Sequence, residues 1–377
     1  MNIGGIESCV AFVDSFLPHK CFQFGFHDNG RVFKCVVGQD AIEAKLSWSR
    51  PINAKPTDPI WRALLYASLL KMGQKKYYLT VGHPQSMSHF YDEEYLPSGQ
   101  IKFILPSGYM NKEEKSTSIL INDIMPVGEC YAHAYAYKKI LNKGCIVISL
   151  GFGTIELGAV SSDGTVIKGS AESFTYGLHK ASVIFRKKLF SLGFENPDVR
   201  DRDQYHIFDS YLRRVVDENL GVDTGEKPIN LIIDGRGLKA KDLQAIANET
   251  IEEYSVELKR RVIDYIRSQA FNSTLDIVLT GGGTNYDILV EAIRESCKPY
   301  NIEVSVGDKK LARESGAIGL RVIADEVYDG VSGYGVDVGH HNTLFEVETK
   351  LESDDINHEA TYVKVMPTEV EGVEIGH

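Results

Sequence analysis

Residues 144–160, GCIVISLGFGTIELGAV, determine the predicted fold of this chain. The apolar and β-branched run at 145–148 is typical of a buried strand, and a second strand follows the turn. Gly151 and Gly153 let backbone N–H groups turn toward a common point without a Cβ in the way, which is how a loop binds phosphate. An ordinary glycine-containing hairpin fits the same letters, so this stretch alone leaves both interpretations open.

The composition is that of an ordinary folded protein. The chain has 377 residues, of which 43% are hydrophobic and 25% charged, so we expect two domains. No apolar stretch approaches the roughly 18 to 20 residues of a membrane span, and the first residues lack the basic and apolar segments of a signal peptide. We therefore expect a cytoplasmic protein without a membrane span.

Charge and cysteine content exclude some classes of partner and site. The formal net charge of −11 argues against direct binding to nucleic acid, which relies on clustered Lys and Arg. A contact with DNA would then require a basic adaptor. The six cysteines contain no CxxC pair and lie mostly in apolar runs, which favours reduced core thiols over a disulfide framework or a zinc site.

One order of predicted elements occurs twice along the chain. The first half gives three strands, a helix and a strand at 9–13, 20–26, 31–37, 59–71 and 77–81. The second half gives the same series at 145–150, 155–160, 165–169, 174–192 and 275–280. Tight-turn signals, Asp28-Asn29-Gly30 and Ser162-Asp163-Gly164, lie at matching places. We therefore predict an α/β protein in which three strands open each half, those of the first half as an antiparallel meander.

The predicted domains are 1–143, closed by a late helix at 311–328, and 144–310. Residues 85–118 are polar and irregular apart from a short strand, and we interpret them as a peripheral insertion. Residues 331–377 carry ten acidic side chains against two lysines and show little apolar periodicity. We predict that this acidic tail is disordered or ordered by a partner.

Two further motifs are candidates for a nucleotide site. In Thr280-Gly281-Gly282-Gly283-Thr284-Asn285, three glycines follow an apolar strand, which is uncommon for packing alone, and the next helix offers N–H groups to an anion or ribose. In Pro126-Val127-Gly128-Glu129, a carboxylate stands just before a helix. Glu129 can orient a nucleophilic water, or it can be a plain first-turn residue that the helix dipole favours.

The order and spacing of these motifs resemble the actin-like ATPases of the ParM/StbA plasmid-segregation type, related more distantly to Hsp70 and sugar kinases. The resemblance covers residues 9 to about 328. It implies duplicated actin-like (ribonuclease H-like) domains with a nucleotide cleft between them, and ATP or GTP with Mg as cofactors. It also implies that adenosine contacts Gly281, Gly282, Gly283 and Asn285, that Gly177 and Lys180 flank the base, and that Glu129 is the catalytic residue.

The first phosphate loop of this family resembles residues 12–20, FVDSFLPHK, which keep an Asp and a Lys at the family spacing but contain no glycine. The resemblance implies that Asp14 holds a magnesium-bound water and that Ser15 and Lys20 meet the phosphates. A solvated Asp and Lys beside a turn is the alternative.

The second phosphate loop resembles the family's Asp-x-Gly-x-x-Thr, with Ser149, Gly151 and Thr154 at the matching places and Gly153 between them. Ser149 stands where the acidic residue is expected. Because a hydroxyl supplies no negative charge, we expect weak magnesium binding unless Asp14 or Glu156 compensates.

The resemblance favours a filament-forming protein that hydrolyses nucleotide slowly and acts in plasmid or DNA segregation, or in related intracellular positioning. Its expected partners are further copies of itself and a basic DNA-binding or cargo adaptor. A non-hydrolysing scaffold of the same fold, acting through the acidic tail, is the alternative. A small-molecule kinase is a third class, for which the sequence contains no acceptor-binding motif.

Overall fold

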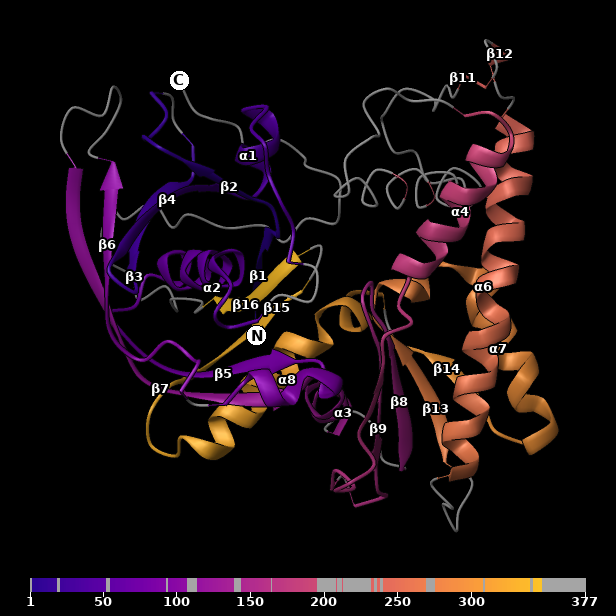
Figure 1. Cartoon of the computed structure of the whole chain (residues 1–377). Coiled ribbons are helices and arrows are strands. Elements are labelled where there is room, and N and C mark those ends of the chain that lie inside the picture. Colours follow the sequence, from indigo (N-terminus) through magenta and orange to yellow (C-terminus); the bar gives the residue numbers. More distant parts are fainter. Residues whose placement is uncertain are drawn as a thin grey trace, which may run out of the picture. The chain divides into compact units, whose positions relative to one another are not determined.

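The computed structural model describes residues 2–18, 21–51, 55–92, 94–106, 114–138, 144–163, 165–194, 208, 212, 232–233, 236–237, 240–268, 275–307, 309–339 and 342–347. The chain divides into two compact units. Unit 1 comprises Met1–Ile140 and Glu314–His377, and unit 2 comprises Leu141–Arg313. Each unit contains its own main sheet and is described by itself (Figure 1).

The sheet of unit 1 has nine strands within the described residues. Their order is β1 (Asn2–Glu7), β16 (Asn342–Val347), β15 (Gly333–Val338), β5 (Lys76–His83), β7 (Glu114–Gly128), β6 (Gly99–Pro106), β3 (Gln23–Asp28), β4 (Arg31–Val37) and β2 (Val10–Val13). The three strands β15, β5 and β7 are parallel, and the other neighbours are antiparallel. Strand β6 joins β7 to β3, so this part of the predicted insertion lies inside the sheet.

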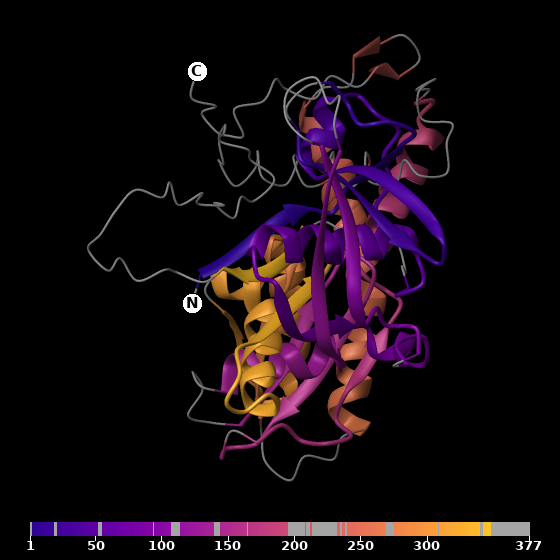
Figure 2. The same cartoon turned by 90° about the vertical axis from the view of Figure 1, so that its left-hand side faces the viewer.

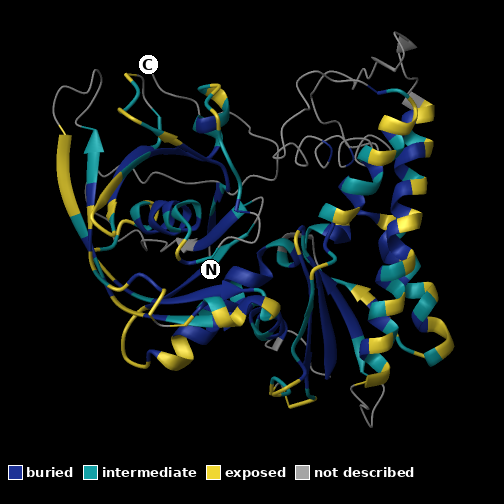
Figure 3. Cartoon of the chain, viewed as in Figure 1, coloured by how far each residue is buried: buried dark blue, intermediate teal, exposed yellow. Residues whose placement is uncertain are grey.

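Helix α2 (Pro59–Met72) is the buried centre of unit 1. It begins where Asp58 Oδ1 accepts from the N–H of Ile60 at 2.8 Å, and it ends at Gly73, whose φ of 73° needs glycine. Every residue from 63 to 69 is buried, so the helix is covered on all sides, because strands curve around it (Figures 1 and 3). In Figure 2 the purple strands of this sheet stand in front of the indigo helix.

The three strands predicted for the start of the chain are present as β2, β3 and β4, but they do not form the predicted meander. β3 and β4 make the expected hairpin, with Asn29 and Gly30 in the left-handed region at φ 47° and 75°. β2, however, pairs with β4 and lies at the sheet edge, while the second neighbour of β3 is β6. The short helix α1 (Gln39–Glu43) follows β4.

The prediction of a disordered or partner-ordered tail is wrong for residues 333–338 and 342–347, which form β15 and β16. β15 lies between β5 and β16, and Val336 is fully buried. Its glycines hide the strand from a search for apolar periodicity, yet they let helix α8 (Lys309–Val327) pack close: a Cβ on Gly333 would stand 2.7 Å from Cβ of Ala324. Residues 348–377 lie outside the described part of the chain.

The main sheet of unit 2 has the order β10 (Glu172–Phe174), β9 (Ile155–Val160), β8 (Cys145–Leu150), β13 (Asp276–Thr280) and β14 (Val304–Val306). β8, β13 and β14 are parallel, and the β8–β9 and β9–β10 pairs are antiparallel. The third strand is therefore β10, not the predicted 165–169, where Val166 makes only an isolated bridge to Val160. A separate pair, β11 (Ile232–Ile233) and β12 (Arg236–Gly237), also belongs to this unit.

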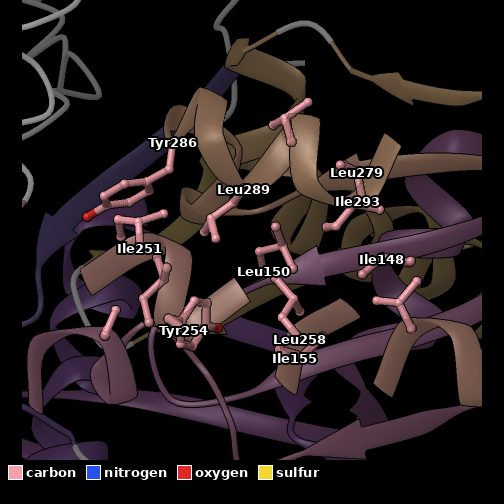
Figure 4. Packing of buried hydrophobic residues seen from close by; sticks show 14 of the residues in the cluster. Ile148, Leu150, Ile155, Ile251, Tyr254, Leu258, Leu279, Tyr286, Leu289 and Ile293 are labelled. Carbon is pink, nitrogen blue, oxygen red and sulfur yellow. The ribbon is translucent and has the colours of Figure 1, made fainter. Parts of the chain in front are cut away.

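Three helices supply the apolar side chains that cover one face of this sheet: α4 (His179–Ser191), α6 (Ala240–Ser268) and α7 (Asp287–Cys297). Figure 4 shows Leu150 and Leu279 from the strands meeting Leu258 and Leu289 from the helices. All four are at most 1% exposed. This core fixes the carboxyl ends of β8 and β13, from which the predicted glycine motifs project.

The predicted duplication is present, although unit 1 builds it from other strands than expected. β1, β16, β15, β5 and β7 have the same order and the same directions as β10, β9, β8, β13 and β14. In each unit a helix follows the fifth strand: α3 (Glu129–Lys138) after β7, and α8 after β14. The remaining strands β2, β3, β4 and β6 extend the sheet of unit 1 only.

Candidate functional site

The turn between β8 and β9 is the first half of the candidate site in unit 2. Leu150 pairs with Ile155 at the end of the hairpin, and the N–H of Gly151 donates to the carbonyl of Thr154 at 3.0 Å. A Cβ on Gly151 would stand 2.8 Å from that same oxygen. The turn therefore needs glycine at this position, whether or not it binds a ligand.

The beginning of α4 determines the orientation of this turn. The carbonyls of Gly151, Phe152 and Gly153 accept from the N–H groups of residues 178, 179 and 177 at 3.0, 2.8 and 3.2 Å. In a trans peptide the N–H points opposite to the carbonyl, and the described residues contain no cis bond. The three successive N–H groups of residues 152–154 therefore point away from α4, as in the backbone concavities that bind anions.

Gly177 supports this turn by close packing. It is buried, and a Cβ there would overlap the carbonyl of Phe152. Lys180, one turn further on, has an exposed side chain. The structure therefore explains Gly177 by its contact with the turn and leaves the position of Lys180 beside a base as a prediction.

The triple glycine lies against the same strand end. Gly281 has a φ of 81°, and a Cβ on it would stand 2.8 Å from the Leu150 carbonyl oxygen. A Cβ on Gly283 would stand 2.5 Å from Cβ of Leu150. These two glycines bring the 3₁₀ turn Gly282–Asn285 onto β8, while Gly282 is half-buried and Asn285 is exposed. Packing thus accounts for two of the three glycines.

Ser149 lies in a row of polar residues across the sheet of unit 2. It pairs with Glu156 on β9 and with Thr280 on β13. Glu156 is 2% exposed and accepts from Ser173 Oγ at 2.7 Å. Since directly paired residues share a face of the sheet, a buried carboxylate stands one strand away from the place where the sequence lacks one. The sequence identified Glu156 as a residue that can compensate for Ser149, and the pairing is consistent with this.

In unit 1 two carboxylates converge on Gly82, near the end of β5. Glu129 begins α3 directly after β7, and Asp337 lies in β15. A Cβ on Gly82 would stand 3.4 Å from Cγ of Glu129 and 3.7 Å from Oδ1 of Asp337. Burial raises the pKa of the Tyr91 phenol, and the negative charges of Glu129 and Asp337 raise it further, as expected when both lie nearby.

Burial also shifts the titration of the groups around this pair. It raises the pKa of Asp337 to about 6, because the charged carboxylate loses hydration. His133 on α3 is buried with a pKa lowered to about 4, and its Nδ1 lies 2.7 Å from Ser315 Oγ. A Cβ on Gly316 would overlap the Asp337 carboxylate, so α8 packs directly on this residue.

Comparison with known proteins gives matches among solved structures only. No family model matches the chain, and no curated protein matches it either. An archaeal actin homolog, Ta0583, in complex with ADP, is 13% identical with a TM-score of 0.57, covering 86% of this chain and 99% of the other.

Two further solved structures resemble this chain about as closely. The actin-like protein Alp7A is 14% identical with a TM-score of 0.58, covering 86% of this chain and 91% of its own. A non-polymerisable quadruple mutant of pCBH ParM is 14% identical with a TM-score of 0.58, and the match covers 85% of this chain and 92% of that chain. The chain has the actin-like fold. At this identity the similarity concerns the fold alone.

Within the actin-like fold, the structure does not bring all predicted site residues together. Asp14 and Ser15 are exposed after β2, the edge strand that four strands separate from β5 in the sheet order. They do not lie beside Glu129, so the structure does not place Asp14, the predicted metal residue, or Ser15 in the candidate site around Gly82. Lys20 lies outside the described residues.

Asp337 is a candidate site residue that the sequence interpretation missed. A signal was present: Asp337-Val338-Gly339 repeats the spacing of Ser149-Leu150-Gly151. The interpretation passed over it because acidic content and weak periodicity assigned residues 331–377 to a tail. The family resemblance also directed attention to the first strands of the chain.

The two carboxylates beside Gly82, Glu129 and Asp337, fit a nucleotide with bound Mg²⁺. Within the described residues no three His, Cys, Asp or Glu side chains form a cluster that could hold a metal ion. Mg²⁺ bound to a nucleotide typically takes only one or two carboxylates, with phosphates and water supplying the rest.

In the described part of the chain, no helix is both long and apolar enough to cross a membrane.

Proposed function

We propose that this actin-like chain binds ATP or GTP with Mg²⁺, assembles into filaments and hydrolyses the nucleotide slowly. The observation that carries the proposal is the turn at 152–154, where three successive N–H groups point to one side of the backbone. An archaeal protein with this fold binds ADP, and a ParM variant with this fold is described as non-polymerisable. Both support the proposal by analogy of fold.

The residues have the following proposed roles. The N–H groups of residues 152–154 bind phosphate oxygens, and Gly282 and Asn285 contact the adenosine. Mg²⁺ neutralises phosphate charge when it is bound. Glu129 accepts a hydrogen bond from the attacking water and orients it. Its location at the start of α3 suits this role, since the neighbouring backbone N–H groups of the helix favour a carboxylate there.

The proposed partners are further copies of the chain and a basic DNA-binding or cargo adaptor, in DNA segregation or related positioning within the cytoplasm. Direct binding to nucleic acid is not proposed, because the net charge is −11. An acidic segment after residue 347 offers an adaptor eight carboxylates against two lysines. Attraction between opposite charges would then couple cargo to the filament.

A non-hydrolysing scaffold is the second candidate. The observation that favours it is Ser149, a neutral hydroxyl at a position where the family resemblance implies a carboxylate. If Glu156 does not replace that charge, the nucleotide would bind weakly or not at all.

Sedimentation of the full chain tests these alternatives. The protein is centrifuged without nucleotide and with ATP, GTP or ADP, each with Mg²⁺ or with EDTA, and released phosphate is measured in parallel. We expect pelleting and slow phosphate release with one triphosphate and Mg²⁺. Pelleting that no nucleotide changes, without phosphate release, would instead establish the scaffold.

A further inference from the structure

The two units match residue by residue at the strands that carry their sites. Strands β8 of unit 2 and β15 of unit 1 correspond to each other. Ile148 on β8 pairs with Leu279 on β13, and Val336 on β15 pairs with Val81 on β5. Ser149 is the next residue after Ile148, and Asp337 is the next residue after Val336. Register therefore equates Ser149 with Asp337, and it equates Thr280 with Gly82.

The turns that follow also match. In unit 2, Leu150 pairs with Ile155 and four residues separate them; in unit 1, Val338 pairs with Thr343 across four residues. A Cβ on Gly151 would stand 2.8 Å from the carbonyl oxygen three residues later, and a Cβ on Gly339 would stand 2.7 Å from the corresponding oxygen. The two glycines thus have the same close relation to the residue three positions later.

In both units, the segment that follows one strand, β10 in unit 2 and β1 in unit 1, holds the carbonyl of the turn glycine. The carbonyl of Gly151 accepts from Leu178 N–H at 3.0 Å, and that of Gly339 accepts from Ser8 Oγ at 2.6 Å. Ser8 also lies 2.9 Å from Thr343 Oγ1, and both hydroxyl residues are fully buried. These hydrogen bonds hold Gly339 and Thr343, which lie on either side of the turn after β15, within unit 1.

Only the order along the chain differs. Unit 2 runs through its five strands in the sequence β8, β9, β10, β13, β14. In unit 1 the third, fourth and fifth strands, β1, β5 and β7, come before unit 2, and the first and second, β15 and β16, come after it. Figure 1 shows the result: yellow β15 and β16 lie in one sheet with indigo β1.

We infer that unit 1 is a circular permutant of the unit 2 topology, and that Asp337 and the turn at Gly339 take the place in it that residues 14–20 were expected to fill. This rests on the proposed nucleotide function for its ligand, a nucleoside triphosphate with a divalent cation. Asp337 is the carboxylate that faces the cation or its water, and Gly339 lets the backbone approach a phosphate. The second carboxylate beside Gly82, Glu129, remains available to the attacking water.

Two variants with a matched change test the site. Asp337→Asn and Asp14→Asn each remove one negative charge, and binding of a fluorescent ATP analogue is titrated in Mg²⁺ and in EDTA. We expect Mg²⁺ to tighten binding to the parent and to Asp14→Asn equally, and this gain to fall at least tenfold in Asp337→Asn. Loss of the gain in Asp14→Asn with retention in Asp337→Asn would overturn the inference.

Rewiring the chain tests the permutation without any nucleotide. Val347 lies opposite Asn2 in the β16–β1 pair, so an Asn-Gly turn can join them. The rewired chain starts at Val331, runs to Val347, continues through Asn-Gly into Asn2 and ends at Gly330. Its control is the unrearranged chain that ends at Val347. We expect cooperative thermal unfolding within a few degrees of the control, whereas an unfolded rewired chain would contradict the permutation.

The two experiments separate the inference from the proposed function. If the parent binds no nucleotide in Mg²⁺ or EDTA, the proposed function is wrong and the role of Asp337 toward a cation is wrong with it. The rewired chain still decides the permutation in that case. If the parent binds nucleotide and the two Asp variants behave alike, only the assignment of Asp337 is wrong.

Discussion

The side chains of Asp337 and Glu129 approach the same point, where a Cβ on Gly82 would stand 3.7 Å from Oδ1 of the first and 3.4 Å from Cγ of the second. These two residues come from segments that lie on either side of unit 2 in the sequence. The parallel strands β15, β5 and β7 bring them together, because their carboxyl ends lie at one edge of the sheet. A glycine between the carboxylates leaves room the size of a methyl group, which Cδ1 of Leu320 also borders at 3.4 Å.

Gly82→Ala tests whether that room is used. The added methyl group would stand at ordinary contact distances, 3.4 to 3.7 Å, so we expect a stability loss below about 1.5 kcal/mol. The same methyl group occupies space between the carboxylates, so the effect of Mg²⁺ on nucleotide binding should weaken. Thermal unfolding and titration of nucleotide in Mg²⁺ and EDTA measure the two effects. Unchanged dependence on Mg²⁺ would show that the space beside Gly82 is not part of the site.

Glu129→Ala tests the proposed hydrolysis. Removing a group that orients the attacking water should lower the rate of phosphate release by roughly 10²- to 10⁴-fold, with little effect on nucleotide affinity. Ser149→Asp is the companion change, since it adds the charge that the second loop lacks and should raise the rate at low Mg²⁺. Phosphate release that is as fast in Glu129→Ala as in the parent would contradict the role of Glu129.

Gly177→Ala tests the turn in unit 2. A Cβ at this position would overlap the carbonyl of Phe152, so the turn at 151–154 must move. We expect a stability loss of about 1–3 kcal/mol and a large loss of nucleotide affinity. Lys180→Ala, a change at an exposed position of α4, serves as control and should leave stability unchanged. Normal nucleotide binding by Gly177→Ala would show that the orientation of this turn is irrelevant to the ligand.

Substitutions in the triple glycine can distinguish a packing role from a binding role. Gly283→Ala should destabilise the protein by about 1–3 kcal/mol, because its Cβ would stand 2.5 Å from Leu150 Cβ. Gly282 is half-buried, and Gly282→Val should obstruct an adenosine that lies against the backbone while the protein stays folded. Nucleotide titration and thermal unfolding of the two variants give the comparison. A Gly282→Val protein that is folded and binds nucleotide like the parent would disprove the adenosine contact.

The sequence was sufficient where a pattern is local. The run at 145–160 predicts β8, the turn and β9, and Asp28-Asn29-Gly30 predicts the β3–β4 hairpin, because turn chemistry and strand alternation depend on neighbours in the chain. The predicted strand at 275–280 and the helix that follows the triple glycine are also present, as β13 and α7.

The sequence was insufficient where strand pairing is non-local. Whether β2 or β15 lies next to β5 depends on contacts across the whole chain, and nothing in Asp14 itself distinguishes a site carboxylate from an exposed one. Gly333 and Gly335 further weaken the apolar pattern of β15, because they are selected for close packing on α8: a Cβ on Gly335 would stand 2.5 Å from Arg321 N. Asp337 was therefore assigned to a tail instead of to the site.

Two truncated chains test the role of the last segment. A chain that ends at Gly330 lacks β15 and β16, so β5 keeps β7 but loses one of its two parallel neighbours, and β1 loses the one strand that it pairs with among the described residues. We expect this chain to be insoluble or to lose cooperative unfolding, as measured by circular dichroism on heating. A soluble protein with the melting temperature of the parent would contradict the placement of these strands.

A chain that ends at Val347 keeps every described strand and removes eight acidic residues and two lysines. It should therefore unfold like the parent. In a filament, like-charged segments of neighbouring subunits repel one another, and salt screens this repulsion over about 10 Å at 0.1 M. We expect the chain ending at Val347 to sediment at a lower protein concentration than the parent in low salt, and at the same concentration in high salt. A chain that is folded but does not assemble would show instead that residues 348–377 are required for the contact between subunits.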